Sequence, residues 1–177
     1  MGTLDELAGW LGHAHYLERR CYEILGSWVA PTPEPQAKAV LAEQCYHHAW
    51  HAEVWARRFP AGYGRDLDSA ARPASAGLAA ALDQLASAPG TVERLAGFFR
   101  VLQPRKIVVY DRLRRTSSDV SDRPVLRWLD VVVTDEVEDW RRGEALVQAL
   151  LRDEAAPEAL AWQADLEAHF VAAGELM

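Results

Sequence analysis

The sequence is poor in cysteine and contains no long apolar run. Its 177 residues include only two cysteines, Cys21 and Cys45, which are too few for a disulfide framework, so we expect two free thiols. No uninterrupted apolar run is long enough to cross a membrane, and the first residues lack the basic segment followed by an apolar one that marks a secretory signal. We therefore expect a cytoplasmic protein without a membrane partner.

An excess of positive charge and several catalytic motifs are also absent. The formal net charge of −7 argues against non-specific binding to nucleic acid, because such binding depends on clustered basic residues. The sequence contains no glycine-rich phosphate loop, no paired Cys-x-x-Cys motif and no nucleophile elbow. Its length suits one domain, residues 1–177, that can bury a sizeable core.

Regularly spaced apolar residues predict helices along nearly the whole chain, and no segment shows the alternation typical of a strand. We expect four long helices at about 4–30, 33–58, 91–116 and 121–150, a short one at about 76–87 and a C-terminal one at about 157–173. Pro104 should kink the third long helix or reset its phase. Short turns within each helix pair and a long connection between the pairs predict an all-α four-helix bundle, made of two helical hairpins with a long crossover.

Each long helix carries an acidic residue within an apolar stripe. The helices of the first predicted hairpin carry Glu18 and Glu43, and those of the second carry Asp111 and Glu136 at the same interval in sequence. On the second helix, Glu43 and His47 recur at helical spacing with apolar residues, so we expect both to face the core. An unpaired buried carboxylate is costly, so a metal ion, a cation or a hydrogen-bond network must compensate each one.

Four carboxylates at one level of a helical bundle resemble the ligands of the ferritin-like superfamily of di-iron carboxylate proteins. That family uses one Glu from each of two helices and a Glu-x-x-His motif from each of the other two. The resemblance implies that Glu18 and Asp111 are the single-helix ligands and that Glu43 and Glu136 are the acids of the motifs. It also implies a ferritin-like fold over roughly residues 4–150, with iron or manganese as the cofactor.

The chain departs from the family's pattern at the histidines. Tyr46 and Asp139 stand where the motifs require His, and His47 follows Tyr46 directly. In the predicted hairpin His15, one turn before Glu18, should face the level of His47. A half-site suited to iron, manganese or zinc would then consist of His15, Glu18, Glu43 and His47. The alternative is a buried hydrogen-bonded cluster that holds no metal.

The second half-site, around Asp111 and Glu136, has several arginines nearby and no histidine in reach. We therefore favour Arg–carboxylate pairs there over a second metal ion. On the second helix, His48 should turn away from the expected stripe and His51 should lie at its edge, so neither is favoured as a ligand.

The resemblance implies a ferritin-like metalloprotein that acts on a small molecule as a metal-dependent oxidase or oxygenase. Its metal ligands would be drawn from Glu18, Glu43, His47, Asp111, Glu136, Asp139 and His15. We consider a homodimer as its assembly. Two alternatives stay open. One is a metal-free, degenerate ferritin-like bundle that serves as a binding or partner-interaction module, and the other is a metal-free enzyme in which buried Glu18 or Glu43 acts as a general base.

Overall fold

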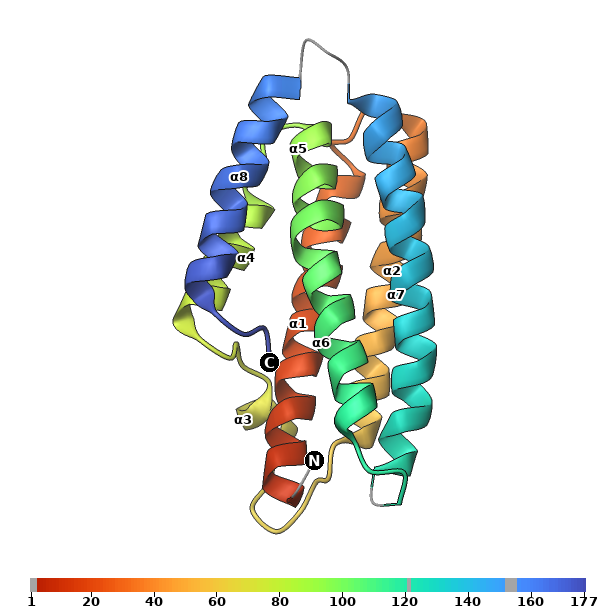
Figure 1. The fold of residues 1–177 in the computed structure, drawn as a ribbon, viewed down its shortest axis with the longest axis vertical. Helices are drawn as coiled ribbons and strands as arrows, with labels where there is room; N and C mark the ends of the chain where they lie inside the picture. The colour runs from red at the N-terminus through yellow and green to blue at the C-terminus, as the bar shows by residue number, and fades with distance from the viewer. Residues whose placement is uncertain (1–2, 121, 152–155) are drawn as a thin grey trace.

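The computed structural model describes residues 3–120, 122–151 and 156–177. In these residues the chain is helical and contains no strand (Figure 1). The elements are α1 (Leu4–Val29), α2 (Pro35–Arg58), α3 (Leu67–Ala70), α4 (Ala76–Ala86), α5 (Thr91–Ala96), the π-helix η1 (Gly97–Leu102), α6 (Gln103–Thr116), α7 (Arg123–Leu150) and α8 (Ala156–Ala173). The expected all-α class is thus confirmed for the described part of the chain. Residue 121, at the expected start of the fourth long helix, lies outside it.

The helices α1, α2 and α7 and the continuous run of α5, η1 and α6 form four long rods. These rods run alongside one another (Figure 1). α1 packs along α2, α2 packs against α7, and α7 packs against α6. The third rod consists of α5, η1 and α6, which follow one another without a break. The connection from α2 to this rod carries α3 and α4, and α8 packs against α4, α5 and η1 on one side of the rods.

The buried face of α2 differs from the expected one. The core side of α2 includes Ala37, Leu41, Gln44, His48, His51 and Trp55. The expectation that Glu43 faces the core is wrong: its side chain is 41% exposed and accepts two hydrogen bonds from Arg142 of α7, one of them 2.7 Å long. The two faces differ by one residue, which is about 100° around a helix. The outward position lets Glu43 pair with an arginine without losing its hydration.

The π-helix η1 sets the phase of α6. It lies directly before Pro104, where the sequence predicts a kink or a change of phase. The wider turn of a π-helix moves every later side chain around the helix axis. α6 consequently buries Gln103, Lys106 and Tyr110, whereas Asp111 is partly exposed.

α7 approaches η1 closely at Gly143. A Cβ atom at this position would lie 2.2 Å from Phe99 Cδ1, far inside van der Waals contact. A glycine therefore allows the fully buried ring of Phe99 to lie directly against α7. This contact fixes the spacing between the rods that carry Glu136 and Lys106.

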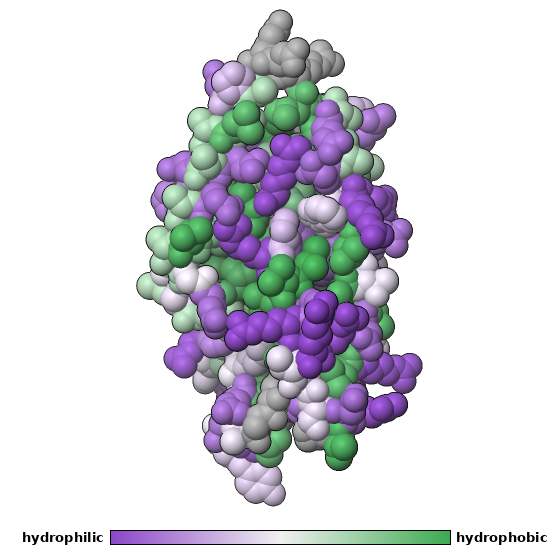
Figure 2. Space-filling model, viewed as in Figure 1, coloured by the Kyte–Doolittle hydropathy of each residue, from purple (hydrophilic) through white to green (hydrophobic). Residues whose placement is uncertain are grey.

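The surface mixes charged and apolar side chains. On the face seen in Figure 2, apolar side chains gather over α6 and the segment that follows α8, and charged side chains border them. Among the described residues, no helix combines the length and the apolar character that crossing a bilayer requires.

Candidate metal centre

Four side chains from three helices converge in the core. Glu18 lies on α1, His48 and His51 lie on α2, and Glu136 lies on α7, and all four are buried. One possible ligand atom from each residue lies within 4.8 Å of the other three. We call these four residues the Glu/His cluster. Two carboxylates and two imidazoles at such distances can hold a metal ion.

Two residues of α6 contact the Glu/His cluster. The Lys106 ammonium, which has no exposed surface, donates from Nζ to Glu136 Oε1 at 2.8 Å and to Glu18 Oε2 at 3.0 Å. The Tyr110 hydroxyl donates to Glu18 Oε1. A buried charge is tolerated when it is paired and hydrogen-bonded, and here one ammonium serves both carboxylates. Lys106 thus supplies a cation that compensates the buried acids.

These ion pairs hold both carboxylates in the charged form. Burial alone would raise the pKa of Glu18, but Lys106 and the hydrogen bond from His48 lower it well below its ordinary value. Burial would likewise raise the pKa of Glu136, and Lys106 and His51 help to lower it to about 2. For Lys106, burial would lower the pKa, but Glu136 and Glu18 raise it far above its ordinary value. The three groups therefore stay ionised near neutral pH.

His48 is neutral and donates to Glu18. Its Nδ1 lies 2.6 Å from Glu18 Oε2 and 3.2 Å from Lys106 Nζ. Burial, together with the charge of Lys106, lowers the pKa of His48. The neutral ring has a single N–H, and we assign its proton to Nδ1 because a carboxylate oxygen faces that atom. Nε2 is then a buried acceptor without a hydrogen-bond partner among the described residues.

His51 is held from outside by a carboxylate. Its Nε2 lies 3.3 Å from Asp135 Oδ2, while its Nδ1 lies 3.4 Å from Glu136 Oε1 and 3.8 Å from Glu18 Oε2. Burial would lower the pKa of His51, but Asp135, Glu136 and Glu18 raise it well above its ordinary value. Nδ1 is buried and has no hydrogen-bond partner within the described ranges. Ligand histidines are typically arranged in this way, with the outer nitrogen on a carboxylate and the inner one facing the metal.

Buried amides connect the neighbouring helices to α7. Gln103 Nε2 on α6 lies 3.3 Å from both the backbone oxygen and the Oε2 atom of Glu136. Gln44 Nε2 on α2 donates to the backbone oxygen of Asp139 at 3.0 Å. These bonds restrict the position of α7, and with it the position of the Glu136 carboxylate.

Of the ligands predicted from the sequence, the structure brings Glu18 and Glu136 together. Asp111 is not in the Glu/His cluster, because it pairs with two arginines of its own helix, each at 2.6 Å. The expected Arg–carboxylate pairs thus form at Asp111, whereas Glu136 pairs with Lys106 and not with an arginine. Glu43 also lies outside the cluster, on the surface.

The remaining predicted ligands lie beside the Glu/His cluster. His47 Nδ1 is 2.8 Å from Asp139 Oδ2, so these two residues form a pair between α2 and α7. His15 Nδ1 is 2.8 Å from the backbone oxygen of Ala52. None of the three belongs to the set of converging ligand atoms, and their role as ligands stays a prediction.

Sequence reasoning misses His48, His51, Lys106 and Tyr110. The two histidines carry a usable signal: they lie three residues apart and continue the stripe that contains Leu41. Lys106 carries none, because a lysine next to an arginine in sequence is ordinarily a solvated side chain.

Comparison of the chain with protein-family models, with curated proteins and with solved structures finds no match. The chemistry of the site therefore rests on its own donor atoms. Two imidazoles and two carboxylates suit iron, manganese or zinc. His51 Nδ1 has no hydrogen-bond partner among the described residues and fits a metal ligand once the ring has lost a proton. Lys106 already binds the two carboxylates, so a metal ion must share those oxygens with Lys106 or displace it.

Proposed function

We propose that this chain is a ferritin-like metalloprotein that uses iron or manganese, held by the Glu/His cluster, to oxidise a small molecule as an oxidase or oxygenase. The observation that carries the proposal is the convergence of two carboxylates and two imidazoles in a fully buried space. The arrangement of two hairpins joined by a long crossover supports the ferritin-like part.

Within this proposal the chain has three tasks. Glu18, His48, His51 and Glu136 hold the ion. Asp135 orients His51 through Nε2, so that Nδ1 faces the site. The surrounding core excludes water, because every member of the Glu/His cluster is buried. A bound iron or manganese ion would supply the redox chemistry of the proposed reaction.

Metal content tests the proposal directly. Protein purified from iron-supplemented and from manganese-supplemented cells should contain close to one equivalent of metal, and Glu136→Gln and His51→Gln should each lose most of it. Glu43→Gln is the matched control, because this acid is exposed and pairs with Arg142. Wild-type protein with less than about 0.2 equivalents of any transition metal, and no rise in Tm on adding iron or manganese, would count against the metal.

Oxidation is tested on the metal-loaded protein. With ascorbate as the electron donor, metal-loaded wild type and Glu43→Gln should consume dioxygen faster than free metal at the same concentration, and Glu136→Gln should not. Equal rates for all samples would remove the oxidase or oxygenase part of the proposal while leaving metal binding intact.

One observation favours a second candidate, a metal-free bundle that acts as a binding or partner-interaction module. Lys106 already compensates the buried carboxylates, and it does so with short hydrogen bonds to both. In that case Glu136→Gln changes stability and removes no bound metal. The same elemental analysis therefore separates the two candidates.

A further inference from the structure

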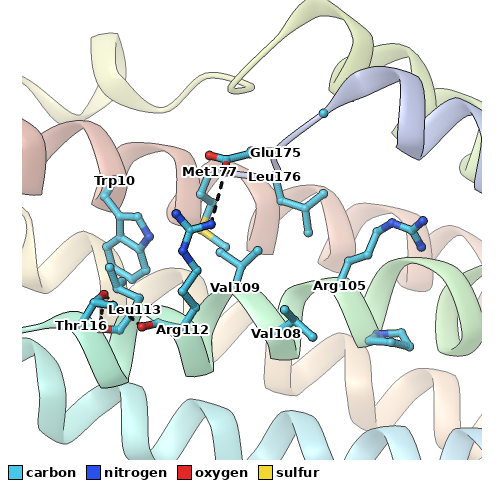
Figure 3. Close-up of a pocket in the computed structure, with 12 residues that line it drawn as sticks. Trp10, Arg105, Val108, Val109, Arg112, Leu113, Thr116, Glu175, Leu176 and Met177 are labelled. Atoms are coloured by element: carbon cyan, nitrogen blue, oxygen red, sulfur yellow. Dashed lines mark hydrogen bonds and ion pairs between the residues drawn. The ribbon is translucent and has the colours of Figure 1, made fainter.

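A pocket of about 510 Å³ lies outside the Glu/His cluster, between α6, Trp10 of α1 and the segment 174–177 (Figure 3). Its apolar lining includes Trp10, Val108, Val109, Leu113, Leu176 and Met177. The segment 174–177 turns at Gly174, whose φ of +82° favours glycine, and it is anchored by the buried Leu176. The pocket is thus a built feature with a fixed wall, and its volume falls within the range of small-molecule sites.

The lining carries two arginines, and they differ in availability. Arg105 Nη1 donates to the backbone oxygen of Val101 and to Glu167, each at 2.8 Å. Arg112 has a weaker partner: its side chain reaches across the pocket to Glu175 at 3.4 Å, and the two side chains are 72% and 73% exposed (Figure 3). An exposed pair of this length contributes little, so Arg112 can exchange Glu175 for another anion.

Two aromatic rings in succession, Trp10 and Tyr110, connect the pocket to the Glu/His cluster. The Trp10 ring lines the pocket and lies edge-on to Tyr110, with 6.1 Å between the ring centroids. The Tyr110 hydroxyl in turn donates to Glu18. α6 therefore turns Lys106 and Tyr110 toward the cluster and Arg112 toward the pocket.

We infer that this pocket binds a small amphipathic carboxylate. The apolar body of the ligand lies against Trp10, Val109 and Leu113, and its carboxylate accepts hydrogen bonds from Arg112 in place of Glu175. A guanidinium binds a carboxylate through two parallel hydrogen bonds, which gives the end of the ligand a defined position. That this ligand is also the substrate rests on the proposed function, whereas its binding does not.

Calorimetric titration with decanoate tests the inference, with decanol and decylamine as probes of the same length. Wild-type protein should bind decanoate saturably below its micelle concentration, and at least about tenfold more tightly than either control, because hydrogen bonds to charged groups dominate the difference. Equal affinity for decanol would overturn the role of Arg112, and tighter binding of decylamine would show that Glu175 selects a cation instead. Absence of saturable binding would overturn the site itself.

Substitutions locate the binding. Arg112→Gln should weaken decanoate binding about tenfold, whereas Arg115→Gln, an exposed arginine of the same helix that pairs with Asp111, should leave it unchanged. Glu175→Gln should tighten binding, because it removes the competing carboxylate. Val108→Trp should block binding by filling the pocket from an exposed position. Equal losses in Arg112→Gln and Arg115→Gln would mean that only general charge is involved.

The outcome is distinguishable from the test of the metal. Decanoate binding by metal-free wild type, with no metal retained in any preparation, would leave the pocket assigned and remove the proposed oxidase. If Arg112→Gln kept its full metal content and no variant bound decanoate, the metal site would stand and the assignment of the pocket would be removed.

Discussion

The ammonium of Lys106 on α6 lies 2.8 Å from the carboxylate of Glu136 on α7, and both side chains are fully buried. The same ammonium also contacts Glu18, so one cation joins acids from two different rods. A metal ion bound by the Glu/His cluster would compete with Lys106 for these oxygens. This contact therefore decides both how stable the metal-free protein is and how tightly the site takes up a metal.

Replacing Lys106 should separate these two effects. Lys106→Met leaves two buried carboxylates without their cation, so the metal-free protein should lose about 3–5 kcal/mol of unfolding free energy. The same variant should bind manganese more tightly and regain stability when manganese is added, because the competitor is gone. Urea denaturation with and without manganese, compared with Arg115→Gln as the surface control, measures both. A loss below about 1 kcal/mol would show that the buried pair is not coupled as described.

The stability of the metal-free protein should depend on pH in a defined way. The pKa of Glu136 falls from an ordinary 4.5 to about 2 on folding, so its contribution is complete above pH 4.5 and is lost as the pH falls through about 2. The pKa of His51 is raised above its ordinary 6.5, so its contribution is complete below pH 6.5 and is lost as the pH rises through the folded value. For these two groups the unfolding free energy should form a plateau between pH 4.5 and pH 6.5.

Urea denaturation in the presence of a chelator, from about pH 3 to about pH 9, measures this profile. The loss from Glu136 should reach on the order of 2 kcal/mol by about pH 3, out of roughly 3 kcal/mol for its whole shift at 1.36 kcal/mol per pKa unit. Glu136→Gln should reduce the acid-side loss and leave the part that comes from Glu18, whose pKa is also lowered on folding, whereas Glu43→Gln should have a much smaller effect. A wild-type profile that stays flat on both sides contradicts the assignment of charges in the Glu/His cluster.

The close approach of α7 to η1 should be sensitive to one methyl group. In Gly143→Ala the new Cβ would meet the Phe99 ring, and overpacking of this kind costs about 1–3 kcal/mol. Gly9→Ala is the matched control, since nothing lies within 4 Å of its added Cβ and alanine favours a helix. Thermal denaturation should show a lower Tm for Gly143→Ala and an equal or higher one for Gly9→Ala. Equal behaviour of the two would mean that the helices separate freely at this point.

The sequence is informative about helices and about two of the acids. Apolar periodicity predicts the long helices, and the polar interruption of that periodicity points to Glu18 and Glu136. Apolar periodicity does not give the buried face of α2. One stripe contains Glu43 and the adjacent stripe contains His48 and His51, so spacing alone does not decide which of them faces the core. The choice depends on partners from α7 and α6, such as Arg142, that are distant in sequence.

Lys106 illustrates a second limit. Hydropathy places lysine at the surface, and only the three-dimensional proximity of two carboxylates makes its burial favourable. On α6 the sequence predicts Asp111 as a core-facing ligand. The structure instead buries Tyr110, the residue directly before it.

The wide turn of η1 determines which side chains of α6, the lower half of this rod in Figure 1, face the core. Deleting one amino acid within 97–102 should convert η1 to ordinary α-helical winding and leave Lys106 and Tyr110 facing the Glu/His cluster, because the wide turn takes up one extra residue. A single deletion in an α-helical part of a rod would instead rotate all that follows by about 100°. Tolerance to single-residue deletions should therefore be higher in η1 than in the rods on either side.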